Sequence, residues 1–262
     1  MIDSHAHLCS DELFPVLDEK LEAARLVGVR NFLTVSSNWD SVSKNVAIAE
    51  KYDNIVCSVG VHPLHAMEPY DVDELISLCT NEKVVAVGEV GLEYHYVDLM
   101  PKAEQLRCLQ GMLSVAQKSG LPCILHAREC CDDILGLLRE YAIKHAVFHC
   151  YTDTLENAKR ILDAGFFISF SGIITFKNAG ALSEVVKYVP DDRFLVETDC
   201  PDLAPVPYRG KVNEPAYVSV VAEHVAALRN VSLEAVDEMT TRNFFSLFPK
   251  AAILMKKEMP NA

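Results

Sequence analysis

Short runs of β-branched and aromatic residues alternate with amphipathic stretches along the whole chain. The runs predict buried strands, and the stretches, with apolar positions three and four residues apart, predict helices that cover a sheet. This alternation is typical of repeated βα units around a parallel sheet. The predicted strands are 2–7, 31–35, 55–61, 84–89, 123–126, 146–149, 166–169 and 194–197. The predicted helices are 13–26, 41–51, 72–79, 102–118, 132–141, 155–164 and 181–188.

The number and order of these elements predict the fold class. Eight strands alternating with helices indicate an α/β protein of the TIM type, a (β/α)8 barrel. The segment from Pro201 to Pro215 contains four prolines, so we expect a loop there. Extra C-terminal helices are predicted after it, at 216–228 and 233–247. Because no linker interrupts the pattern, residues 1–262 are predicted to form a single domain.

Composition and charge narrow the class of protein. Half of the 262 residues are hydrophobic and 23% are charged, which excludes a wholly disordered chain. The net charge of −13 gives no general attraction to phosphate backbones or anionic lipids, so any such affinity must be local. The longest apolar runs fall far short of the ~18 residues of a membrane helix, and the first residues do not resemble a signal peptide. Nine cysteines without a CxxC pair indicate reduced thiols in a cytoplasmic protein. We expect the protein to bind no membrane and to have no obligate protein partner.

Side chains that bind metal ions recur where the predicted strands end. His5 and His7 lie two residues apart on the first predicted strand, so both imidazoles point to the same side. A lone histidine is more often a packed or surface residue, but the C-terminal strand ends of a TIM barrel carry its active site, so the joint pattern predicts one site. The other members are His62, Glu89, His126, His149 and Asp199.

The number of these side chains exceeds the number of ligands that one catalytic metal ion needs. A catalytic zinc usually has three protein ligands and an open position for water. Two ions fit better, since a carboxylate can bridge two cations and a pair about 3.5 to 4 Å apart can assist phosphoryl displacement. Glu89, central in strand order, is the natural bridge.

Short motifs at these positions carry a resemblance to a known family. They are DSHAHL (3–8), GVHP (60–63), GEVGL (88–92), HAR (126–128), FHC (148–150), ETDCP (197–201) and RGKVNEP (209–215). Together they resemble the TatD-type metal-dependent deoxyribonucleases, which belong to the amidohydrolase-like barrels. The motifs run in family order across nearly the whole chain, so chance does not explain them.

The resemblance implies ligands, cofactors and an activity. It places His5, His7, Glu89 and Asp199 on a first ion, and Glu89, His126 and His149 on a second. It implies a hydrolase that acts as a DNase, a 3′ to 5′ exonuclease supported by Mg²⁺. His62 is assigned to the substrate phosphate or to orientation of the ligands.

Three positions depart from the family pattern. Glu93 and Cys9 stand where the family has aspartates, and Ala127 stands where it has a serine. None removes a predicted ligand. Glu93 is one methylene longer than aspartate, so we expect its contact with a metal-ligating side chain or with the substrate to be displaced. The resemblance therefore indicates the chemistry more firmly than the substrate specificity.

A mechanism follows from the predicted ligands and charges. Metal-activated hydroxide would attack phosphorus, and Asp199, acting with Glu89, would orient that water and accept its proton. Glu197 either points into the same site or is the buried partner of an arginine or histidine. Side chains expected to contact the phosphates of single-stranded or frayed 3′ DNA ends are Arg128, Arg209 and Lys211. Aromatic residues that could stack on bases, or simply belong to the core, are Tyr94, Tyr151 and Phe176.

Two alternatives remain at this point. The same barrel and ions could serve a small-molecule amidohydrolase or lactonase, because the fold does not choose the scissile bond. A binding scaffold is disfavoured, because every expected ligand position is filled. Imidazole-rich ligation suits Zn²⁺ or Mn²⁺, whereas the family resemblance points to Mg²⁺.

Overall fold

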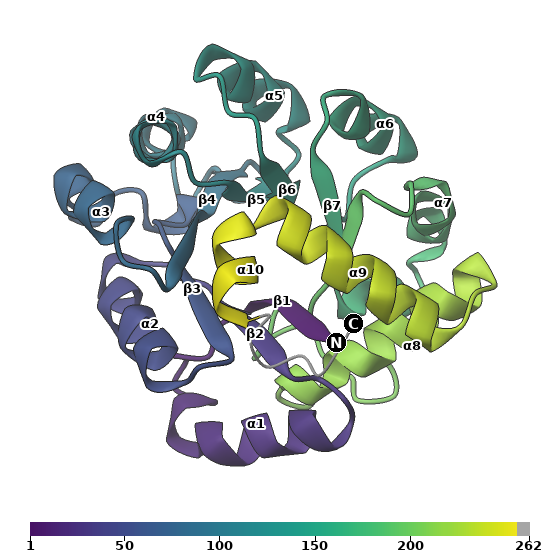
Figure 1. Cartoon of the computed structure of the whole chain (residues 1–262). Helices are drawn as coiled ribbons and strands as arrows, with labels where there is room; N and C mark the ends of the chain where they lie inside the picture. Colours follow the sequence, from purple (N-terminus) through teal and green to yellow (C-terminus); the bar gives the residue numbers. More distant parts are fainter. Residues whose placement is uncertain (256–262) are drawn as a thin grey trace. The chain divides into compact units, whose positions relative to one another are not determined.

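The computed structural model describes residues 1–255, and in this part of the chain the predicted alternation of strands and helices is present (Figure 1). One parallel sheet has eight strands in the order β1 to β8, so the fold class is the predicted (β/α)8 type. The strands are β1 (Ile2–Ala6), β2 (Asn31–Thr34), β3 (Ile55–Val59), β4 (Val84–Glu93), β5 (Cys123–Arg128), β6 (Ala146–Phe148), β7 (Phe167–Phe170) and β8 (Phe194–Val196).

Helices follow the strands along the chain, as the apolar spacing predicted. They are α1 (Leu17–Leu26), α2 (Trp39–Lys51), α3 (Val72–Leu78), α4 (Lys102–Ser119), α5 (Cys131–Glu140), α6 (Leu155–Asp163), α7 (Gly180–Tyr188), α8 (Val218–Arg229), α9 (Leu233–Leu247) and α10 (Pro249–Met255). Short 3₁₀ turns are η1 (Phe14–Val16), η2 (Pro63–His65), η3 (Gly172–Thr175) and η4 (Pro215–Tyr217). None of the helices within 1–255 has both the length and the apolar character needed to cross a membrane.

Two compact units make up the described chain. The first contains residues 1–34 and 150–246, with strands β7, β8, β1 and β2. The second contains residues 35–149 and the chain from Leu247, with β3 to β6. The prediction of one domain over 1–262 stays a prediction, and residues 256–262 lie outside the described residues.

Within the first unit, the beginning and end of the barrel sequence lie side by side. The amide of Asp199 donates to the carbonyl of His5 over 2.9 Å, and the amide of His7 donates to the carbonyl of Cys200 over 2.8 Å. These bonds join β1 to the segment after β8. Two regions far apart in the chain, each carrying predicted ligands, are therefore adjacent.

Within the second unit, β4 continues four residues beyond its predicted end at Glu89. The extension pairs with β5, with Gly91 opposite His126 and Glu93 opposite Arg128. A Cβ on Gly91 would lie 1.9 Å from the His126 carbonyl oxygen, so only glycine allows this approach. The prediction stopped too early because it took the polar Glu89 as a strand end.

The C-terminal region differs from the prediction by one helix. The sequence predicted two helices after the last strand, and the structure has a third, α10. Pro249 begins it, and the Lys250 ammonium donates to the carbonyls of Cys79, Asn81 and Val84 over 2.5–3.0 Å. This anchoring is a long-range contact within the second unit, which local periodicity does not report.

All residues of most strands are buried, as expected for a parallel sheet covered on both faces. Buried polar groups are therefore the informative exceptions. On β1 and β4 they include Asp3, Ser4, His5, Glu89 and Glu93.

Candidate metal centre

A triangle of ligand atoms lies at the end of β1 and after β8, within the first unit. Nε2 of His5 and Nε2 of His7 are 3.4 Å apart. Oδ1 of Asp199 lies 3.5 Å from the first nitrogen and 3.4 Å from the second. His5 is fully buried, whereas His7 and Asp199 are partly exposed. The predicted alternation on the first strand, which aims both imidazoles to one side, is what the structure shows.

The triangle has the dimensions of a metal site. Three nitrogen or oxygen ligands 2.0–2.2 Å from a tetrahedral ion lie roughly 3.3–3.6 Å from one another. All three edges of the triangle, at 3.4–3.5 Å, fall in this range. Imidazole nitrogen and carboxylate oxygen are also the ligand types of divalent transition metals. His5, His7 and Asp199 therefore fit a divalent ion.

A second group, in the second unit, has Glu89 as its hub. The Oε1 atom of Glu89 lies 2.7 Å from Nε2 of His149 and 2.9 Å from Nδ1 of His126. Nε2 of His62 lies 3.5 Å from the same oxygen. His62, Glu89 and His126 place one ligand atom each within 4.8 Å of the others, which makes them a second group able to hold a metal. His62, which was expected to contact the substrate phosphate or to orient the ligands, thus lies among the ligand atoms of this group.

Glycines and backbone bonds determine where Glu89 lies on β4. Its amide donates to the carbonyl of Ser36 over 2.8 Å, and the Ser58 hydroxyl donates to the carbonyl of Gly88 over 2.6 Å. A Cβ on Gly88 would lie 2.6 Å from the Ile124 Cβ, so any larger residue would push β4 away from β5. Close packing against β5 therefore requires a glycine at position 88, next to the predicted ligand Glu89.

Glu89 and His62 have the protonation states that metal ligands need, whereas the pKa of His126, which burial alone would lower, is raised by its hydrogen bonds to Glu89 and Glu93. Burial would raise the pKa of the Glu89 carboxyl, but the charges and hydrogen bonds of His149, His62 and His126 hold that pKa well below its usual value. Burial lowers the pKa of His62 to about 3, so its imidazole is neutral. An ionised carboxylate and neutral imidazole are the forms that coordinate a cation.

Glu93, which was predicted to support the metal ligands, is the last residue of β4. Its Oε2 is 3.0 Å from Nε2 of His126 and 3.8 Å from Nη1 of Arg128. Its Oε1 accepts the amide N–H of His95 over 3.0 Å. The two ring nitrogens of His126 thus face two carboxylates, those of Glu89 and Glu93. A carboxylate in this place orients the imidazole ring.

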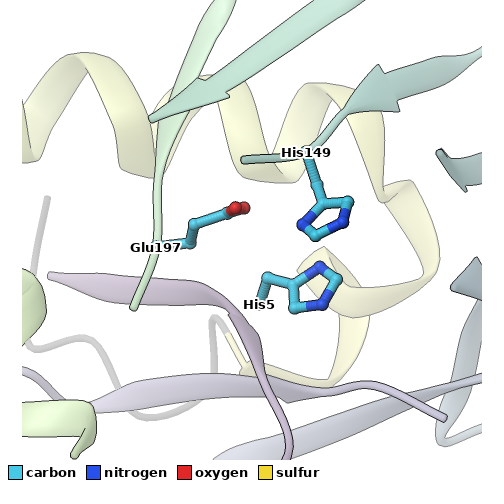
Figure 2. A group of neighbouring side chains, drawn as sticks. All are labelled: His5, His149 and Glu197. Carbon is cyan, nitrogen blue, oxygen red and sulfur yellow. The ribbon is translucent and has the colours of Figure 1, made fainter. Parts of the chain in front are cut away.

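Glu197 follows β8 directly and is buried in the first unit. Figure 2 draws its carboxylate together with the imidazole of His5. Its Oε1 accepts the amide N–H of Cys150 over 2.7 Å. One contact of this carboxylate is therefore a backbone amide, a partner that the sequence did not indicate.

The three cationic residues predicted to contact phosphates lie near aromatic rings, and two of them, Arg209 and Lys211, are exposed. The Arg209 guanidinium is 3.8 Å above the ring of Phe176, and the Lys211 ammonium is 5.7 Å from the ring of Tyr208, both in the first unit. In the second unit, Arg128 lies 5.3 Å over Tyr96. Each cation thus lies within the ~6 Å of a ring centroid at which cation–π attraction acts.

Two aromatic residues with a possible base-stacking role are part of the core instead. Tyr94 is 9% exposed, and its hydroxyl donates to Asp133 over 2.5 Å. Tyr151 is 5% exposed, and its hydroxyl donates to the Thr154 carbonyl over 2.6 Å. Neither ring offers an open face for a base.

Comparison with known proteins matches nearly the whole chain to one family. The family described as TatD related DNase matches residues 2–249. The chain belongs to this family. The match includes all the motifs that carry the resemblance, from DSHAHL to RGKVNEP. The resemblance stated from the motifs is confirmed.

Curated relatives and solved structures of the TatD family agree with this assignment. The chain is 42% identical over 253 residues to an Escherichia coli K12 protein named uncharacterized metal-dependent hydrolase YcfH, with 95% of both chains covered. It is 38% identical over 252 residues to uncharacterized metal-dependent hydrolase YabD of Bacillus subtilis, covering 95% of this chain and 98% of that protein. The crystal structure of YjjV, a TatD homologue from E. coli, superposes with a TM-score of 0.90 at 26% identity, covering 95% of this chain and 98% of that one. This chain is a metal-dependent hydrolase of the TatD family.

Proposed function

We propose that this TatD-family hydrolase cleaves phosphodiester bonds in DNA and removes nucleotides from single-stranded or frayed 3′ ends. The observation that carries the proposal is the triangle of His5, His7 and Asp199, whose edges fit a divalent ion. The DNase description of the family supports DNA as the substrate. Nine cysteines present as thiols fit a reducing, cytoplasmic location.

Two divalent ions are proposed, each held by side chains already described. The first would be held by the triangle together with Glu89, and the second by Glu89, His126 and His149, with His62 at its side. When bound, such ions supply positive charge that lowers the pKa of a nearby water and stabilises the charge that develops on phosphate. Imidazole-rich ligation favours Zn²⁺ or Mn²⁺ in the first position, whereas Mg²⁺ remains the proposed ion for activity.

The chain's own groups would then hold and deprotonate the attacking water. Asp199 is partly exposed, so its carboxylate can meet both the ligand sphere and the substrate. We assign it to orient the water and to accept its proton, as a general base does. Glu93 would fix the ring of His126, and His62 would orient ligands or contact the phosphate. Glu197 would support the site from its buried position after β8.

The test of the proposal compares substrate classes on one preparation. Metal-stripped protein is incubated with end-labelled single-stranded DNA and with a panel of lactones and amides, and Mg²⁺, Mn²⁺ or Zn²⁺ is added in turn. We expect mononucleotides to be released from the 3′ end only after an ion is added, and His5→Ala to abolish the release. Hydrolysis of a lactone or amide without DNA cleavage would instead assign the site to a small-molecule amidohydrolase.

Arg209 provides a separate test of phosphate recognition. Among residues 1–255 its guanidinium has a ring contact with Phe176 and no ion pair, so its donors are available to a phosphate. Arg209→Ala should lower kcat/KM on DNA about 10- to 100-fold, the effect of losing one or two charge-assisted hydrogen bonds. Metal content, measured by elemental analysis, should not change.

A matched control exists at the other end of β8. Arg193 also lies over a ring, 5.3 Å from Phe167, but it immediately precedes the strand, away from the end that carries Asp199. Arg193→Ala should leave kcat/KM unchanged. Equal kinetics of the Arg209 variant and the unmodified protein would remove Arg209 from the substrate site.

A further inference from the structure

Asp3 has a buried carboxyl group two residues before the first ligand, and the proposed chemistry does not use it. Its Oδ1 accepts the amide N–H of Thr198 over 2.9 Å and that of His5 over 3.4 Å. Its Oδ2 accepts the Thr198 hydroxyl over 2.6 Å. One side chain therefore binds the backbone next to Asp199 and the backbone of His5 itself.

Thr198 is held through each of its polar groups. Besides its two bonds to Asp3, its hydroxyl oxygen accepts the amide N–H of Cys200 over 3.2 Å. Its carbonyl accepts the Asn213 side-chain amide over 2.8 Å, and the same amide group donates to the Asp202 carbonyl over 2.6 Å. The backbone on both sides of Asp199 is thus fixed by buried hydrogen bonds.

These bonds surround a residue with an uncommon backbone conformation. Asp199 has a φ of 59°, in the left-handed region, which a residue with a Cβ adopts at a cost. A strained conformation of this kind persists when the surrounding structure determines it. Here the same conformation accompanies the approach of Asp199 Oδ1 to the two Nε2 atoms of His5 and His7.

We infer that Asp3, Thr198 and Asn213 are positioning residues, which hold Asp199 in its left-handed conformation and thereby preorganise the triangle of His5, His7 and Asp199 for a divalent ion. The inference rests on the proposed function, since it takes the triangle to be an ion site. It assigns a role to three residues that do not themselves touch the ion. Preorganisation of this kind raises ion affinity, because the ligands need not be ordered on binding.

A purely structural role would be to join β1 to β8, and the chain contains a control for it. The Ser4 hydroxyl donates to the Val196 carbonyl over 2.9 Å and is also buried. This bond links the same two strands one residue away from Asp3, but it does not contact the backbone of Asp199. Ser4→Ala therefore weakens the strand connection and leaves the ligand geometry unaltered.

The experiment measures ion binding to the metal-stripped full chain, with Co²⁺ as the probe. Calorimetry gives the dissociation constants, and the visible absorption of Co²⁺ reports the geometry of its ligands. The variants are Thr198→Val, which keeps the shape and removes the hydroxyl, Thr198→Ser, which restores it, and the Ser4→Ala control. His5→Ala identifies the ion that belongs to the triangle.

We expect Thr198→Val to lower the affinity for that ion about 10- to 100-fold and to change the Co²⁺ absorption spectrum. This is the usual effect of losing a hydrogen bond that orients a metal ligand. Thr198→Ser should restore both, and Ser4→Ala should lower the melting temperature without altering either. Should Thr198→Val fail to fold, Asn213→Ala, which releases the Thr198 carbonyl, replaces it with the same expected result.

The outcomes separate the inference from the proposed function. Unchanged Co²⁺ affinity and spectrum in a folded Thr198→Val or Asn213→Ala protein would overturn the positioning role, and so would an equal loss of affinity in Ser4→Ala. If the unmodified protein binds no Co²⁺ that His5→Ala removes, the triangle is not an ion site, and the proposed function fails together with the inference.

Discussion

Asp199→Asn is expected to lower kcat on single-stranded DNA about 10²- to 10⁴-fold, the contribution typical of a positioned general base. Asparagine keeps the size of the side chain and an oxygen that can face His5 and His7, so part of the ion affinity should remain. It cannot accept a proton from water. The measurement is steady-state release of labelled 3′ nucleotides, together with the ion content of the purified variant.

Asp202 supplies the control for this substitution. It lies three residues further along the same loop, and its contact with Asn213 uses its backbone carbonyl, which Asp202→Asn retains. This variant should keep kcat within about twofold of the unmodified protein, because the Asp202 side chain is exposed and interacts with Asp199 and His7 only through space. Full activity of Asp199→Asn would show that the proton is accepted elsewhere.

Glu89→Gln should lower the activity on single-stranded DNA about 10³-fold or more. Three imidazoles surround one oxygen of this carboxylate, those of His149, His126 and His62. In the proposed site Glu89 would bind both ions. The two ions together would stabilise the transition state by several kcal/mol, and losing that stabilisation corresponds to a fall in rate of about 10³-fold or more. Calorimetry with Mn²⁺ should show weaker binding of both ions.

Glu93→Gln is the matched comparison on the same strand. Glu93 is equally buried and contacts His126, which belongs only to the proposed second ion. The substitution of Glu93 should lower the affinity for the second ion and leave the affinity for the first ion unchanged. If Glu89→Gln also affected only one ion, Glu89 would not be the bridge, and two separate sites would have to replace the shared one.

The candidate site could be predicted in large part because its ligands follow a repeated rule. Most of them lie near or just after the C-terminal end of a strand, although Glu89 lies four residues before the end of β4, and the strands are visible as buried apolar runs. His5 and His7 needed only the two-residue alternation of a strand to be placed on the same side. Their meeting with Asp199, across most of the chain, is what the structure then showed.

Other features of the site have no local signal. Asp3 and Thr198 lie 195 residues apart, and nothing in either neighbourhood indicates their hydrogen bonds. The extension of β4 depends on the absence of a Cβ at Gly91 opposite His126. The partnership of His62 with Glu89 depends on the neighbouring strands β3 and β4.

By itself the sequence determined the order of strands and helices and the set of residues able to bind a metal. These follow from periodicities of two and 3.6 residues and from side-chain chemistry, which are local properties of the chain. Only the tertiary structure decided which atoms meet: the three edges of the His5, His7 and Asp199 triangle, the hub at Glu89, and the anchoring of α10 by Lys250. Such contacts depend on the register of neighbouring strands and on buried hydrogen bonds between distant segments, so they arise only when the chain is folded.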